Sequence, residues 1–124
     1  MKRIILEMGM GNDLYGEDYT KAACRAVQDA LHHSSLILFR SLGFDHADMS
    51  VKVTIGVQKP DNVDCDAVAA TLPRGHAQVI AVKGGQNVTD PEHDTVSVIA
   101  TAAVEAYLDI DANDWALSTS SNTR

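Results

Sequence analysis

The sequence predicts an α/β fold of the α+β kind: a two-layer sandwich in which two main helices cover one face of a small mixed sheet of three to four strands. Short segments with continuous or alternating apolar residues predict the strands, and longer segments with apolar residues three and four positions apart predict the helices. A chain of 124 residues has the usual size of one domain. We therefore expect a single domain over residues 1–117, followed by a disordered polar tail, 118–124.

Three strands are expected. The apolar run RIILEM predicts the first at residues 3–8, ended by the glycines at positions 9 and 11. Valine and isoleucine alternate with other residues over 49–58, which predicts a second strand with one buried face. The third, over 76–85, ends at a Gly-Gly pair. At 36–42 the following glycine favours a short helix, and a strand is the alternative.

Two main helices are expected. The first begins at Asp18, a good N-cap, and closes near residues 32–34, with one narrow apolar stripe. The second covers residues 90–110, because an aspartate N-cap is followed by Pro91 at the first helical position, where proline is favoured. A shorter helix is expected over 64–72, stopped by proline and glycine.

The expected sheet is small, since sheets usually contain about four to six strands. Both main helices are lined with alanine, which allows close packing but buries little area per residue. We therefore expect copies of the chain to complete one another's sheet or core in a homo-oligomer. A strand at 36–42 would weaken this expectation.

The composition argues against several kinds of partner. The net charge is −7 and the basic residues are scattered, so no basic surface for nucleic acid is expected. No apolar run approaches the roughly 20 residues of a membrane span, and the N-terminal residues lack an apolar signal core. We expect no membrane association and a cytoplasmic location. Cys24 and Cys65 are too few and too distant for a disulfide framework or a zinc motif. No cofactor is predicted.

The stretch LEMGMGNDLYGEDYTKAA, residues 6–23, passes from a strand to a helix through three glycines. Corners of this kind often bind phosphate. The glycine spacing here fits neither the dinucleotide-binding motif nor the Walker motif, and Asp13, Glu17 and Asp18 would repel an anion. A site for a neutral or cationic polar group, or for a metal, fits these charges better.

The same corner resembles the N-terminal signature GxGxDxHG of a family of small uncharacterised proteins found in bacteria and plants. Gly9, Gly11, Asp13 and Gly16 match the motif position by position, whereas Tyr15 stands where the family has histidine. A weaker pattern extends the similarity over nearly the whole chain. The resemblance implies a site at this corner but no chemistry, and the tyrosine argues against a mechanism that needs an imidazole there.

We predict a ligand pocket at a subunit boundary, lined by the 9–16 loop and the turn at 83–85. In an enzyme, Asp13 would be the general base or ligand anchor, Lys83 would polarise a carbonyl oxygen and Tyr15 would orient the substrate. Glycines complete the ligand-binding set: Gly9, Gly11, Gly16, Gly84 and Gly85. If the first and third strands run in the same direction, Asp13 and Lys83 would meet at the carboxyl edge of the sheet.

Two functions fit these residues. The first is a small-molecule-binding oligomer, with hydrolase or isomerase chemistry on a small polar metabolite as its enzymatic form. The second is a non-catalytic binding or assembly module, in which the glycine corner is structural, Asp13 caps a turn and Lys83 guards a sheet edge. A metal-dependent activity at the DHAD loop, residues 45–48, is a third and weaker hypothesis, so no metal site is predicted.

Overall fold

A computed structural model describes residues 2–32, 50–72 and 76–108 of the chain. Its elements, in chain order, are β1 (Lys2–Asp13), α1 (Tyr19–His32), β2 (Ser50–Val57), the 3₁₀ turn η2 (Pro60–Asn62), α3 (Cys65–Ala70), β3 (His76–Lys83), β4 (Gln86–Asp90) and β5 (Thr95–Leu108). The expectations for residues 36–42, for the 45–48 loop and for the 118–124 tail lie outside the described residues.

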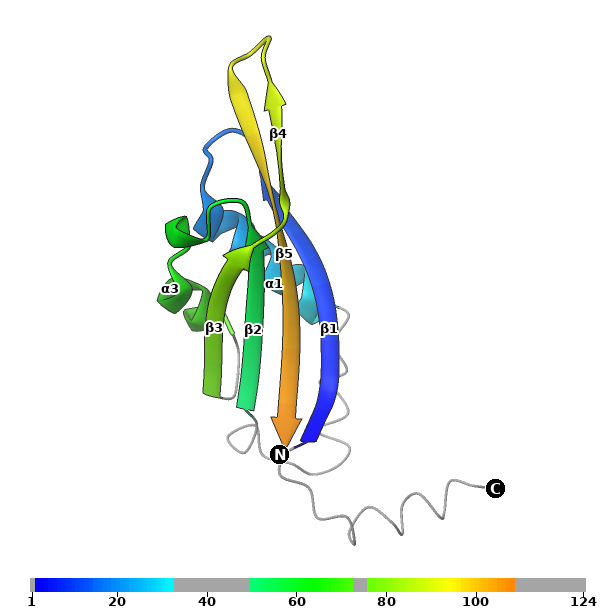
Figure 1. Ribbon diagram of the computed structural model, residues 1–124. Coiled ribbons are helices and arrows are strands. Elements are labelled where there is room, and N and C mark those ends of the chain that lie inside the picture. Colours follow the sequence, from blue (N-terminus) through cyan, green and yellow to red (C-terminus); the bar gives the residue numbers. More distant parts are fainter. Residues whose placement is uncertain (1, 33–49, 73–75, 109–124) are drawn as a thin grey trace, which may run out of the picture.

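The strands form one mixed sheet with the order β1-β5-β2-β3 (Figure 1). β5 runs antiparallel to β1 and β2, and β2 runs parallel to β3, so β1, β2 and β3 share one direction. β4 pairs with residues 95–99 of β5, and the two form a hairpin arm that projects beyond the rest of the sheet (Figure 1). Both α1 and α3 pack on one face. The predicted two-layer α+β plan is confirmed.

The main helix predicted over residues 90–110 is wrong, because this segment forms the turn of the arm and the long central strand β5. Every second residue from Val98 to Leu108 is buried, which is the period of a strand. The many alanines of this segment suit either structure, so the hydrogen-bonded ladders to β1 and β2 decide the outcome. Asp90 opens the hairpin turn, where its carboxylate accepts the N–H groups of Glu92 and His93.

With β4 and β5 the sheet has five strands, more than the three or four that were expected. The small size of the sheet therefore no longer argues for an oligomer.

The other elements are confirmed near their expected positions. Asp18 caps α1, since its carboxylate accepts the N–H of Lys21 at 3.0 Å. Asp64 caps α3 in the same way, by accepting the N–H of Ala67 at 3.1 Å. β1 is longer than expected, because its glycines continue the strand to Asp13 instead of ending it.

Those glycines allow α1 to lie directly on β1. A Cβ at Gly11 would lie 2.6 Å from the carbonyl oxygen of Ala22, and one at Gly9 would lie 2.9 Å from the Cα of Ala30. The α1 residues at these contacts are alanines, namely Ala22, Ala26 and Ala30. The backbone of the helix therefore packs against the backbone of the strand with few side-chain atoms between them. The core between the helices and the sheet is accordingly built mainly from alanine and valine, with a few larger residues: Ala22, Ala23, Ala26, Val27, Ala30, Val53, Ile55, Val57, Val98, Ala100, Ala102, Val104 and Leu108.

Among the described residues, the helices are too short and too polar for any of them to cross a membrane.

Candidate functional site

Asp13 organises the loop between β1 and α1. The residue is 5% exposed, and it is the polar residue that the described part of the chain buries most deeply. Its Oδ2 atom accepts the backbone N–H of Gly16 at 3.1 Å and that of Asp18 at 2.9 Å. The loop is therefore wrapped around this carboxylate, which fixes the start of α1 relative to the end of β1.

Two cations face the other oxygen of the same carboxylate. Lys21 Nζ lies 3.7 Å and Arg25 Nη1 3.8 Å from Asp13 Oδ1. The N–H of Asp18 lowers the pKa of Asp13 most, and Lys21, the N–H of Gly16 and Arg25 lower it further, whereas burial raises it. A carboxylate with a lowered pKa is a weak base at neutral pH, so these partners suit a capping role better than proton abstraction.

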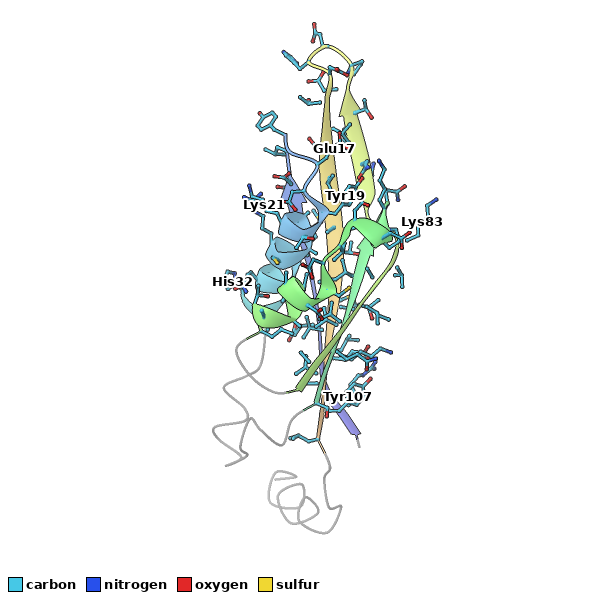
Figure 2. All side chains as sticks on the ribbon, turned by 90° about the vertical axis from the view of Figure 1, so that its left-hand side faces the viewer. Glu17, Tyr19, Lys21, His32, Lys83 and Tyr107 are labelled. Carbon is cyan, nitrogen blue, oxygen red and sulfur yellow. The ribbon has the colours of Figure 1, made fainter. Side chains whose placement is uncertain are left out.

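The other residues predicted to be catalytic lie elsewhere. Tyr15 is 80% exposed on the loop. β1 and β3 do run in the same direction, but they occupy opposite edges of the sheet, about 14 Å apart, so the expectation that Asp13 and Lys83 meet is wrong. Figure 2 shows Lys83 on the side of the sheet away from Lys21 and His32 of α1. One chain alone does not bring the three residues together.

The sheet face turned away from α1 and α3, called the open face below, has no described helix over it (Figure 2). Cross-strand pairing places its side chains in rows that run over β1, β5, β2 and β3. Two neighbouring rows are Met8, Ala103, Thr54 and Ile80, and Met10, Thr101, Gly56 and Val82.

The sizes of these side chains turn the two rows into a groove along the strands. The outer strands carry the large residues: Met8 and Met10 are 67% and 59% exposed on β1, and Ile80 and Val82 are 37% and 42% exposed on β3. Within these two rows, the inner strands carry only alanine, threonine and glycine. The groove, called the trough below, has a volume of about 310 Å³, has Met8 and Val82 as its apolar walls, and reaches Lys83 and Gly84 at one end.

The predicted ligand-binding residues are divided between this trough and the opposite layer. Gly9, Lys83 and Gly84 line the trough. Gly11 packs against α1, and Gly85 adopts a φ of 62° where β3 turns into β4, a conformation that favours glycine.

A charged row borders the trough at the end away from Lys83. Glu105 of β5 lies between Leu6 of β1 and Lys52 of β2. Its carboxylate accepts the hydroxyl of Tyr107 at 2.6 Å and Nη1 of Arg3 at 3.3 Å. The Tyr107 hydroxyl lowers the pKa of Glu105 most, and Arg3 and Lys52 lower it further against the effect of desolvation. The open face thus combines an apolar trough with a row that carries both signs of charge.

A cluster at the tip of the arm places ligand-type atoms of Asp90, Glu92 and His93 within 4.8 Å of one another. His93 Nδ1 lies 2.8 Å from Asp90 Oδ2, and the turn N–H groups occupy Oδ1 of the same carboxylate. The hydrogen bonds of the turn account for this cluster, so it carries no metal assignment.

These features define a two-layer α+β domain in which one sheet face is closed by helices and the other presents a trough. A model of conserved hypothetical proteins, the Lin0512 family, matches residues 3–106, and the chain belongs to this family. The resemblance to an uncharacterised family is thereby confirmed.

The structure is also similar to the crystal structure of an FtsZ-like protein of unknown function from Nostoc punctiforme, with a TM-score of 0.72 and 32% sequence identity. The similarity covers 87% of this chain and 97% of that chain. No curated protein matches the chain.

Sequence reasoning missed the open face, although a signal for it exists. Leu6, Met8 and Met10 alternate with Glu7 and two glycines, and the third strand is apolar at odd and even positions alike. A strand with apolar residues on both sides needs a partner on both sides. Our interpretation of the first strand as one buried run hides this second face.

Proposed function

We propose that this chain is a binding module that holds a small, elongated, mainly apolar ligand in the trough of the open face. The trough itself supports the proposal: a floor of small residues runs between two apolar walls, and Lys83 stands at one end. Ligand sites generally have this composition, with apolar walls and a few polar groups that fix orientation.

The residues that line the trough indicate the class of ligand. Lys83 is the lining residue with an ionisable side chain, and Thr54 and Thr101 add hydroxyl groups. A ligand with an apolar body and one anionic group near Lys83 complements this arrangement. Hydrolases and isomerases commonly combine an acid and a base beside the substrate, whereas Lys83 is the single titratable group among the lining residues, which favours binding over such an activity.

Filling the floor of the trough tests the proposal. Ala103→Leu is expected to weaken the binding of 1-anilinonaphthalene-8-sulfonate, an apolar anion, at least tenfold, because the leucine side chain takes the ligand's place between the walls. The binding is measured by fluorescence titration. Ala70→Leu on α3 is the matched control, since Ala70 is exposed on the helical side of the molecule.

A second variant separates the contribution of the Lys83 charge to binding from the contribution of the trough's shape. Lys83→Met is expected to weaken binding of the same anionic probe several-fold while leaving binding of its neutral analogue, N-phenyl-1-naphthylamine, unchanged. Equal probe affinity for the wild type and for Ala103→Leu would show that the trough is not the binding site.

A further inference from the structure

We infer that the open face is also an interface between two copies of this chain, which pack sheet against sheet and convert two open troughs into one closed channel. The inference uses the same face as the proposed ligand site, but it stands on packing and charge and needs no ligand.

The open face is where apolar side chains of the sheet remain uncovered. Met8 and Met10 are more than half exposed, and Ile80 and Val82 face solvent from the opposite edge. A sheet face that is meant for water carries polar side chains at these positions. Four large apolar residues in two adjacent rows mark a contact surface instead.

Pairing of a second copy along the edge of strand β1 is less favourable, because side chains of α1 already bind the backbone groups of this edge. The outward N–H of Met10 donates to Asp29 Oδ2 at 2.9 Å, and Arg25 Nη1 donates to the outward carbonyl of Asn12 at 2.7 Å. These bonds use the backbone groups that an added strand would need, and edge strands are commonly protected in this way.

The rows of the open face complement themselves about a twofold axis that runs parallel to the strands between β5 and β2. A half-turn about this axis sets β1 of one copy over β3 of the other, and β5 over β2. Met8 then faces the partner's Ile80, and Met10 faces the partner's Val82. These large side chains of the two copies meet along both edges of the sheets. The small residues of β5 and β2 do not meet, and the space between them forms a central channel.

The same operation pairs the charges. Glu105 of β5 and Lys52 of β2 lie in one row, so Glu105 of each copy faces Lys52 of the other. Any other placement of the axis breaks this match. Opposite charges at the border of an apolar contact fix its register and orientation.

The size of the face predicts a dimer in exchange with the monomer. Four strands about 4.8 Å apart and roughly eight residues long at ~3.3 Å per residue cover a footprint of about 500 Å². Because the side chains protrude from the sheet, the accessible area of the face exceeds this footprint and approaches the roughly 600 Å² per partner of the smallest specific interfaces. We therefore expect the dimer to form at micromolar concentrations.

Charge reversal tests both the interface and its axis. Sedimentation velocity of the full chain, without ligand, is expected to show the wild type moving from 13.3 kDa to twice this mass as its concentration rises. Glu105→Lys and Lys52→Glu should each weaken self-association at least tenfold, because like charges then face each other. An equimolar mixture of the two variants should recover the dimer, since lysines of one chain now face glutamates of the other.

Mixing leaves repulsion within each chain unchanged, so recovery reports contacts between chains alone. A wild type that stays monomeric, a dimer insensitive to both reversals, or a mixture that fails to recover would each overturn the inference. None of these results bears on probe binding by the monomer, which tests the proposed ligand site separately.

If either reversal prevents folding, cysteine cross-linking replaces it. In a chain with Cys24→Ser and Cys65→Ser, Met8→Cys mixed with Ile80→Cys should give a covalent heterodimer with a short bismaleimide. Each chain of the mixture then carries a single cysteine, so no link can form within a chain. The absence of cross-linked dimer above the concentration at which the wild type associates would contradict the proposed axis.

Discussion

Gly11→Ala is expected to lower the free energy of unfolding by about 3 kcal/mol, the upper range for overpacking a well-packed interior. The added Cβ would lie 2.6 Å from the carbonyl oxygen of Ala22 and equally close to the backbone of Arg25. These are backbone atoms of α1, so no rotamer change relieves the contact. The helix must move off β1 or the strand must bend. The entropy that alanine removes from the unfolded chain offsets only about 0.4–1 kcal/mol of this cost.

Urea denaturation at a concentration where the protein is monomeric measures the effect. Met10→Ala is the matched control, because Met10 is the neighbouring residue of the same strand and its side chain points to the open face. We expect this control to cost less than about 1 kcal/mol, as for a side chain that is mostly exposed. A Gly11→Ala protein as stable as the wild type would show that α1 does not pack on β1 as described.

Asp13→Asn is expected to cost about 2 kcal/mol at neutral pH, because hydrogen bonds to a charged group are each stronger than those to a neutral one. Asparagine keeps one acceptor for the N–H groups of Gly16 and Asp18. It loses the negative charge that faces Lys21 and Arg25. We expect the loop still to form, but with weaker hydrogen bonds between residue 13 and the start of α1.

The pH dependence of the stability difference shows whether the ionised carboxylate of Asp13 causes it. The pKa of Asp13 in the folded protein lies below its ordinary value of 3.8, so the unfolded chain binds more protons in the interval between the two values. The stability that Asp13 contributes is complete above pH 3.8 and is lost as the pH falls through the lower, folded-state pKa. The difference between wild type and Asp13→Asn should shrink over this interval.

Urea titrations at several pH values below 6 follow this change. Asp66→Asn, at an exposed aspartate of α3, is the matched control for the loss of one carboxylate. A constant difference between wild type and Asp13→Asn at every pH would contradict the ionised capping role. Binding of the naphthalene probes should be the same in Asp13→Asn and wild type, because Asp13 lies on the helical side of the sheet.

The sequence predicts those parts of the fold in which local signals decide. Asp18 is the expected N-cap of the first helix, and in the structure its carboxylate caps α1. The alternation over 49–58 corresponds to β2, where Val51, Val53, Ile55 and Val57 are buried against the helices and Lys52 and Thr54 of the open face are not buried. In each case the pattern within a few residues is enough to determine the element.

The sequence fails where contacts between distant segments decide. Asp90 and Pro91 form a plausible helix start, and the alanines that follow are good helix formers. β5 is a strand because β1 pairs along one side of it and β2 along the other. Neither pairing can be inferred from the segment itself. The error also concealed the sheet order, which separates Asp13 from Lys83.

The glycine corner shows the same limit at the candidate site. Its spacing indicates correctly that something must come close to the backbone at Gly9 and Gly11. The sequence cannot distinguish a ligand from a helix as the approaching group, and the structure places α1 there. The residues that we assign to binding, Met8 and Ala103 among them, carry no motif and become a surface only when four strands are assembled.

The central claim is that the open face of the sheet is the functional surface of this protein. Methyl NMR on methionine- and valine-labelled protein tests it most directly, by following Met8 and Met10 on the open face and Val27, which α1 buries against the opposite face of the sheet. We expect the Met8 and Met10 signals to shift when the protein is concentrated and when the anionic probe is added, while the Val27 signal stays in place. Methionine signals that respond to neither change would contradict it.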